Sequence, residues 1–295
     1  MARTHLIQAA AMLLTCFRLA AAQDYPVQLN RPNAVGERYI LTSSFTRDST
    51  VQTTIDGTAG PTTRRTVMYA ICASADVLAV APDGEKSQCR YTVLSSSASS
   101  GVGSAELVAA GTVILATYED PIISLLIDGR KPDPALEKKL NKVLDTGRAN
   151  GRQEQRMFGT ELAKKPGDQW GISPQATMEN LNKSPLFDLD LSRISGSTTF
   201  DAVQTMSGQA VMKLSSTMDL ENYGNPAPHS GIARISSSMR SSYAWVLPID
   251  VTKRQLLFSY SIETKLVDVS TGPGPHVQSS VDALSQCVKS TRTSP

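Results

Sequence analysis

Apolar and polar residues alternate along most of the second half of the chain. The clearest run, residues 208–220, reads GQAVMKLSSTMDL and places apolar side chains on one face at Ala210, Met212, Leu214, Met218 and Leu220. An alternation with a period of two predicts a strand with one buried face. The turn Ser207-Gly208 joins this run to the preceding GSTTFDAVQTM, and together they predict an antiparallel hairpin.

Two later runs repeat the pattern. SSYAWVLPI and LLFSYSIETKLVDV each present an apolar side, formed by Tyr243, Trp245, Leu247 and Ile249 in the first and by Leu256, Phe258, Tyr260 and Ile262 in the second. In the first half, the pattern predicts separate strands over 36–49 and 50–57, a hairpin of Val67–Ala81 with Lys86–Leu94 about Asp83-Gly84, and strands over 105–120 and 121–129. The Ser-rich segment 95–104 is interpreted as a surface loop.

One segment has the spacing of a helix rather than a strand. Asp133 is a suitable cap, Pro134 suits the first helical position, and the apolar positions follow at Leu136, Leu140, Val143 and Leu144. Gly147 is expected to end this helix. Its other face carries Glu137, Lys138, Lys139 and Lys142, which we interpret as solvated rather than as a binding patch.

Two further helices are predicted from weaker patterns. Ser173-Pro174 repeats the combination of a cap and a proline, and the helix is expected to run to about Asn182 with Met178 and Leu181 inward. After the GPGP breaker at 272–275, the spacing of Val277, Val281, Leu284 and Val288 predicts a short helix over Val277–Val288.

The stretch KKPGDQWGI, residues 164–172, contains one of only two tryptophans in the chain. Pro166 and Gly167 predict a turn, Asp168 is placed to accept backbone hydrogen bonds in it, and Trp170 is expected to insert into the core. We interpret it as a structural corner rather than an active-site loop.

The N-terminus has the pattern of a secretory signal peptide over residues 1–22: Arg3, an apolar stretch, and Ala20-Ala21-Ala22 before Gln23. Two alternatives are a mitochondrial-type presequence, suggested by Arg18, and a lipobox ending at Cys16. Removal of the peptide leaves 27 basic and 27 acidic residues, and this balance argues against nucleic acid as a partner. No segment predicts a transmembrane helix, so we expect an exported, soluble protein of the periplasm or the extracellular space.

Three cysteines follow the signal peptide: Cys72, Cys89 and Cys287. In the predicted hairpin Cys89 faces Leu78, which places Cys72 about 20 Å away along the strand, beyond the reach of a disulfide. Any disulfide is therefore expected to use Cys287.

Candidate catalytic residues are few. His229 and His276 lie in proline-rich loops, and Asp188 with Asp190 is interpreted as the polar side of an edge strand whose inner side is Phe187, Leu189 and Leu191. Glu119-Asp120 before Pro121 predicts a turn. With no GxSxG, HExxH, GxxxxGK[ST] or GxGxxG motif, the sequence predicts no catalytic residues, no cofactor and no metal site.

The order of these elements resembles that of uncharacterised exported bacterial β-rich proteins. The resemblance covers about residues 107–267 and rests on a Pro-Gly-Asp-x-Trp corner, here Pro166–Trp170, and on a late apolar hairpin that turns through Asp250. It implies an α+β fold similar to periplasmic lipoprotein carriers: a strongly curved, mainly antiparallel, half-barrel-like sheet with two or three short helices on its concave side. The expected organisation is signal peptide 1–22, N-terminal arm 23–35, a single β-rich domain 36–270, and a breaker with a tail or short helix over 271–295.

The function favoured by this fold is non-enzymatic binding of a lipid or lipoprotein chain in an apolar cavity. The candidate lining residues are Trp170, Met212, Leu214, Trp245, Phe258 and Tyr260. The alternative is a structural or protein-interaction module of the cell envelope that uses an exposed strand edge or the basic helix face. A hydrolase is the least favoured function.

Overall fold

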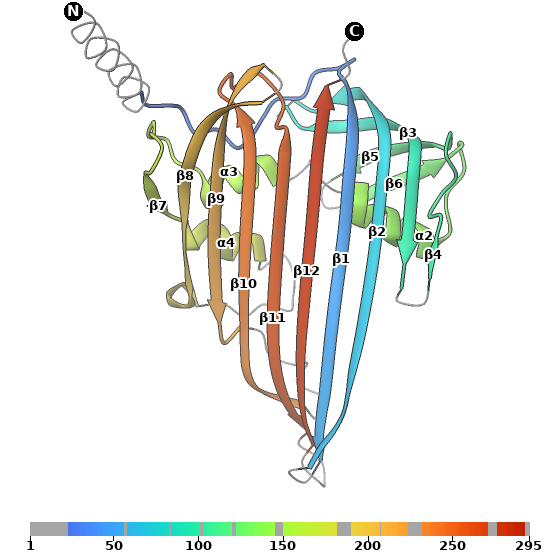
Figure 1. The fold of residues 1–295 in the computed structure, drawn as a ribbon, viewed down its shortest axis with the longest axis vertical. Helices are drawn as coiled ribbons and strands as arrows, with labels where there is room; N and C mark the ends of the chain where they lie inside the picture. Colours follow the sequence, from blue (N-terminus) through green and yellow to red (C-terminus); the bar gives the residue numbers. More distant parts are fainter. Residues whose placement is uncertain are drawn as a thin grey trace, which may run out of the picture.

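The protein is represented by a computed structural model, which describes residues 23–55, 58–82, 84–100, 103–119, 122–144, 150–181, 190–206, 208–223, 232–270 and 276–292. Within these residues, twelve strands form one open sheet in which every neighbouring pair is antiparallel (Figure 1). The strands are β1 Arg38–Ile55, β2 Thr58–Val80, β3 Lys86–Ser99, β4 Ser104–Ala105, β5 Val113–Glu119, β6 Ile122–Ile127, β7 Gln169–Gly171, β8 Ile194–Met206, β9 Gln209–Glu221, β10 Ile232–Pro248, β11 Leu257–Ser270 and β12 His276–Arg292.

The strand order is β6-β5-β3-β2-β1-β12-β11-β10-β9-β8-β7, with β4 paired to β3 outside this path. The first and last strands of the chain therefore meet in the middle of the sheet. Their pairing runs from Tyr39 opposite Arg292 to Ile55 opposite His276. The two halves of the chain form the two halves of the sheet, and the β1–β12 pair joins them.

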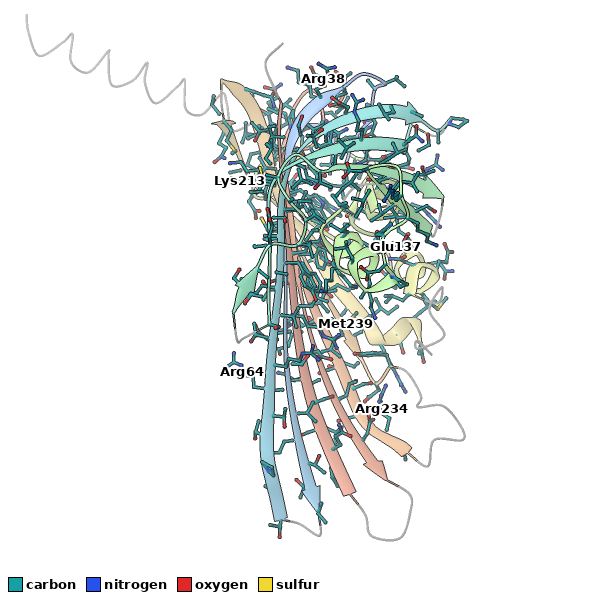
Figure 2. The ribbon with its side chains drawn as sticks, turned by 90° about the vertical axis from the view of Figure 1, so that its right-hand side faces the viewer. Arg38, Arg64, Glu137, Lys213, Arg234 and Met239 are labelled. Carbon is teal, nitrogen blue, oxygen red and sulfur yellow. The ribbon has the colours of Figure 1, made fainter. Side chains whose placement is uncertain are left out.

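Three α-helices occur in the described residues: α2 Pro134–Leu144, α3 Asn150–Phe158 and α4 Pro174–Leu181. A short 3-10 helix, η1, spans Leu191–Arg193. The α-helices lie on one side of the sheet, here called the inner face (Figure 2). The predicted, mainly antiparallel sheet with two or three helices is confirmed, although only α2 and α4 are helices that the sequence pattern predicts. Strong curvature and helix packing on a concave side stay predictions.

The two helix starts that carry a cap and a proline are confirmed. Asp133 Oδ1 accepts hydrogen bonds from the backbone N–H groups of Ala135 at 3.0 Å and Leu136 at 2.9 Å. These bonds satisfy two donors that the first helical turn leaves unpaired. Ser173 Oγ accepts one from Ala176 N at 3.2 Å at the start of α4. Gly147, the expected end of the first helix, lies outside the described residues.

The 164–172 stretch is a corner, as predicted. Gly167 has a φ of +93°, and Asp168 Oδ2 accepts a hydrogen bond from Lys165 N at 3.0 Å across the turn. The following residues form β7, which pairs with β8. Trp170 is half-buried, and its indole Nε1 donates to the Phe158 carbonyl at 2.8 Å. The corner therefore ties the end of α3 to the sheet.

The prediction of a helix over Val277–Val288 is wrong, because this segment belongs to β12. Its backbone is paired on both sides, with β1 and with β11. The position of this segment in the middle of the sheet outweighs the helix-like spacing of its few apolar residues, because hydrogen bonds to a strand on each side pair its backbone N–H and C=O groups. The folded unit consequently extends to residue 292 rather than ending at 270.

Four other expectations need correction. Residues 36–57 are expected to form two strands but contain the single strand β1. The expected loop 95–104 contains the last residues of β3 and the first residue of β4. Strand β5 begins at Val113 rather than at 105. Helix α3 was not predicted, because its sequence NGRQEQRMF has apolar residues only at its end. Of the edge strand expected around Asp188 and Asp190, the structure describes only Asp190 and Leu191. Asp190 caps the first turn of η1 by accepting from Ser192 N, and Leu191 is 41% exposed rather than inward.

Two apolar clusters fill the inner face. The α2 core lies on the first half of the sheet and includes Tyr39, Leu41, Phe45, Ile71, Tyr91, Leu140 and Leu144. The α3–α4 core lies on the second half and includes Tyr25, Val27, Leu29, Phe158, Met212, Leu214, Trp245 and Phe258. The N-terminal arm is part of this second core, and Arg31 then fastens it by donating to Pro248 O at 2.9 Å and Asp250 O at 3.0 Å.

The central strands continue beyond the helices (Figure 1). In these distal strands, residues 46–55, 58–67 and 277–283, none of the described side chains is buried. Arg47 of β1 instead forms an ion pair with Asp282 of β12 at 3.1 Å. The distal strands therefore have no core of their own and depend on the pairing with the helix-covered part of the sheet.

The β2–β3 pairing confirms the predicted hairpin of 67–81 with 86–94, although Cys89 lies opposite Val77 rather than Leu78, because bulges shift the register. Cys72, Cys89 and Cys287 are free thiols. Strand β1 separates Cys72 on β2 from Cys287 on β12. Two strand spacings of about 4.8 Å add up to more than the Cα separation that a disulfide can span. Cys287 could therefore form the expected disulfide only with a cysteine of another molecule.

Candidate functional site

The structure brings the six predicted lining residues together in one place. Met212, Leu214, Trp245 and Phe258 are buried members of the α3–α4 core, and Trp170 and Tyr260 pack against it. The aromatic rings lie in mutual contact, with centroid distances of 5.9 Å between Trp245 and Phe258 and 5.7 Å between Phe258 and Tyr260. Apart from Tyr260, these side chains contribute to packing rather than to the groove described next.

An open groove of about 540 Å³ lies on the inner face beside this core. It is called the α2 groove and is lined by Phe45, Ile123, Ser124, Lys131, Pro134, Glu137, Lys138, Asn141, Lys142, Tyr260, Leu284 and Gln286. Its volume is within the range of about 300–1,000 Å³ that is typical of small-ligand sites.

The floor of the α2 groove comes from three adjacent strands. Gln286 on β12 lies opposite Phe45 on β1 and opposite Tyr260 on β11, so the three side chains form one row across the sheet. Leu284 belongs to the next row on the same face, since side chains two residues apart point to the same side of a strand. Phe45 belongs to the α2 core and Tyr260 packs on the α3–α4 core. The groove therefore lies where the two cores meet.

The wall opposite this floor is the side of α2 that faces β12. Pro134, Glu137, Lys138, Asn141 and Lys142 share this side because they have the i, i+3, i+4, i+7, i+8 spacing of one helix face. Gln286 Nε2 donates to the Lys142 carbonyl at 2.8 Å, which anchors the C-terminal turn of α2 to the floor. The groove consequently has an apolar floor and a charged wall, with Lys138 and Lys142 exposed.

A buried carboxyl group lines a small cavity together with Phe258. Glu154 on α3 is 8% exposed, and its Oε2 accepts a hydrogen bond from Trp245 Nε1 at 2.9 Å. Burial raises the pKa of Glu154 to about 7, an effect that the Trp245 hydrogen bond opposes and the charge of Glu85 reinforces. Glu154 borders a small cavity of about 70 Å³ together with Arg31, Glu85 and Arg254. This volume is enough for a few water molecules.

A second buried polar group joins the ends of β1, β3 and β5. Lys86 is 2% exposed, and its Nζ lies 3.4 Å from Tyr39 Oη and 5.3 Å from the centre of the Tyr118 ring. Burial raises the pKa of Tyr118 to about 12, so its hydroxyl is neutral near pH 7. Arg254 stacks over Tyr39 at 4.1 Å and forms two hydrogen bonds with Glu37. These charges are paired or stacked internally, and we assign them a structural role.

The cavity beside Arg254, about 380 Å³, is lined mainly by the loop residues 32–37 and 252–256. Its charged Arg254 and Glu37 already bind each other. The α2 groove is larger and presents strand side chains together with lysines that have no such partner among the described residues, and we therefore take it as the candidate site.

The candidate catalytic residues do not form a site in the described residues. Asp190 caps η1, His276 begins β12, and His229 and Asp188 lie outside the described residues. Nor do the described residues contain a group of three or more His, Cys, Asp or Glu side chains that would hold a metal ion.

Sequence reasoning missed the groove for a specific reason. Phe45 and Leu284 are separated by most of the chain, and only the pairing of β1 with β12 places them on one floor. The lysines of the wall were noted but interpreted as solvated, because the pattern shows which side of a helix is polar and not what faces it.

No family model and no curated protein matches this chain. A structure of lipid–protein interactions in lipovitellin aligns with 89% of this chain and 26% of its own length, at 11% identity and a TM-score of 0.35. An outer membrane channel from Pseudomonas putida F1 aligns with 88% of this chain and 97% of its own, at 10% identity and a TM-score of 0.19. The CymD monoaromatic hydrocarbon channel aligns with 88% of this chain and 90% of its own length, at 10% identity and a TM-score of 0.12. This chain thus spans about a quarter of the lipovitellin chain, and TM-scores this low carry no argument about function.

Proposed function

We propose that this protein binds the acyl chain of a lipid or lipoprotein in the α2 groove and acts without catalysing a reaction. The observation that carries the proposal is the floor between the two cores, where the apolar side chains of Tyr260 and Leu284 are partly exposed beside the buried Phe45 and Gln286. An aliphatic chain laid on this floor would leave water on one side and contact ring and branched side chains on the other.

The energetics favour a chain-like ligand. Each methylene group that is fully removed from water contributes about 0.8 kcal/mol, which corresponds to roughly a fourfold change in Kd. A groove open on one side removes only part of that surface, so the gain per methylene is expected to be smaller. Affinity should therefore rise with chain length until the groove is filled and then level off.

A residue on the floor offers a direct test. Replacing Leu284 with tryptophan would fill part of the groove, and we expect Kd for the fluorescent fatty acid cis-parinaric acid to rise at least tenfold, about 1.4 kcal/mol of binding free energy. Ala283→Trp is the matched control, because it lies on the same strand with its side chain on the opposite face and should leave Kd within about twofold. Fluorescence titration of the three proteins measures the effect. Equal affinity of Leu284→Trp and the wild type would exclude the groove as the binding site.

A structural or protein-interaction function is the second candidate, and the distal strands favour it. They present side chains on both faces, none of them buried, and among the described residues β2 pairs along 58–67 with β1 alone. Pro61, Arg64 and Arg65 in this segment protect the edge against indiscriminate pairing. A stoichiometric protein partner that is lost from the double variant Arg64→Asp/Arg65→Asp, while acyl-chain binding is absent, would favour this function over the first.

Lipid binding would suit an exported protein of the cell envelope, and we propose that location on the pattern of residues 1–22, which lie outside the described residues. Across the part of the chain that the structure describes, no helix has both the length and the apolar character needed to span a bilayer. The secretory interpretation predicts that the mature chain begins at Gln23, which N-terminal sequencing of the exported protein would confirm or contradict.

A further inference from the structure

The wall of the α2 groove carries more positive than negative charge. Lys131, Lys138 and Lys142 line it, against Glu137 as the acidic lining residue, and the net formal charge of the lining is +2. Lys138 and Lys142 are four residues apart and therefore lie one above the other on α2. Like charges at this spacing repel each other, which makes the wall more favourable for an anion than for a neutral group.

No described carboxylate forms an ion pair with these three lysines, although ion pairs occur elsewhere on the sheet, for example Arg240 with Asp219. Lys142 Nζ lies 5.6 Å from the centre of the Phe45 ring instead. This contact holds one positive charge directly above the apolar floor. An anionic group bound by Lys142 would therefore be attached to a tail that lies on Phe45.

The same wall has unused hydrogen-bonding capacity. Asn141 Oδ1 is buried and has no hydrogen-bond partner among the described residues. A buried polar atom without a partner costs roughly 1–3 kcal/mol, and because an amide oxygen only accepts hydrogen bonds, this cost is relieved by a donor such as water. A carboxylate has no proton to donate to Asn141 Oδ1, so an anionic head group at this wall would be bound through Lys138 and Lys142 and not through Asn141.

We propose that the ligand of the α2 groove is a single-chain lipid with an anionic head group, with the head group bound by Lys138 and Lys142 and the tail lying on Phe45, Tyr260 and Leu284. This inference rests on the proposed acyl-chain binding and adds the charge of the ligand. The volume of about 540 Å³ favours one acyl chain rather than two, because it is the volume of a site for a drug-sized molecule.

The test compares cis-parinaric acid with its methyl ester, which has the same tail and no charge, on three proteins: the wild type, Lys138→Gln/Lys142→Gln, and Lys139→Gln. Lys139 is on the same helix but outside the groove lining, so it controls for the loss of a positive charge from α2 at a position away from the groove. We expect the wild type to bind the acid about tenfold more tightly than the ester at low salt, the effect of two partly exposed charge pairs. The double variant should lose this preference and bind the ester as the wild type does, and Lys139→Gln should keep it.

The outcomes separate the two proposals. Equal binding of acid and ester by the wild type, or an unchanged preference in the double variant, would overturn the anionic head group while acyl-chain binding stands. A wild type that binds neither compound would overturn the proposed function itself. Added salt should weaken binding of the acid and not that of the ester, because only the charged contact is screened. A circular dichroism spectrum unchanged from that of the wild type shows that the double variant keeps its overall secondary structure.

Discussion

Replacing Trp245 with alanine is expected to lower the free energy of unfolding by roughly 3–5 kcal/mol, the range for removing a large buried aromatic side chain. Trp245 is 1% exposed and contacts the rings of Phe158 at 5.6 Å and Tyr243 at 5.8 Å. The substitution would leave a cavity in the α3–α4 core and remove the donor that binds Glu154. Urea unfolding followed by circular dichroism measures the change.

Leu94→Ala is the control for this prediction, since Leu94 is a large apolar residue that is 49% exposed on β3. A substitution there should change stability by no more than about 0.5 kcal/mol. A loss below about 1 kcal/mol for Trp245→Ala would show that Trp245 borders open space instead of filling a core. The α3–α4 core would then be a rival ligand site to the α2 groove.

Glu154→Gln is expected to stabilise the protein above neutral pH. The pKa of Glu154 is raised by burial to about 7 from an ordinary value of 4.5, so the folded state binds this proton more tightly than the unfolded state does. The stability contributed by the neutral carboxyl is fully present below about pH 4.5 and is lost as the pH rises to about 7. The loss amounts to roughly 3 kcal/mol. Glutamine keeps an acceptor for Trp245 without the charge.

The measurement is the difference in unfolding free energy between Glu154→Gln and the wild type at several pH values. The difference should be near zero at pH 4.5, rise up to pH 7 and stay constant above it. Glu161→Gln, at an exposed position, controls for the change of residue type and should show no such rise. A variant that is less stable than the wild type at pH 8 would mean that Glu154 is ionised and stabilising in the folded protein.

Local patterns were sufficient to predict elements whose two faces differ strongly. Two elements are found where the pattern places them: the strand that contains Met212 and Leu214, and the helix capped by Asp133. Each buries one apolar face in a core between the helices and the sheet. The pattern failed for α3, whose polar residues cover it except at Met157 and Phe158. It also failed for β12, where apolar residues three or four apart predict a helix although both strand edges are paired.

The candidate site was less predictable than the fold. Tyr260 was expected at a ligand site and lies on the floor of the α2 groove, whereas Met212, Leu214 and Trp245 fill a core. Both roles require an apolar side chain on the inner face, and a sequence pattern cannot distinguish them. Whether space remains above a residue is decided by the helix that covers it: α3 and Phe158 cover Trp245, and α2 leaves Leu284 partly exposed.

The central claim is that an acyl chain lies on the floor formed by β1, β11 and β12, and photocrosslinking tests it most directly. A fatty acid with a photoreactive diazirine in its tail is bound to the purified protein and irradiated, and the modified peptides are identified by mass spectrometry. The account predicts adducts on the peptides that contain Phe45, Tyr260 and Leu284. Adducts confined to the distal strands or to the 32–37 loop, with these peptides unmodified, would contradict it.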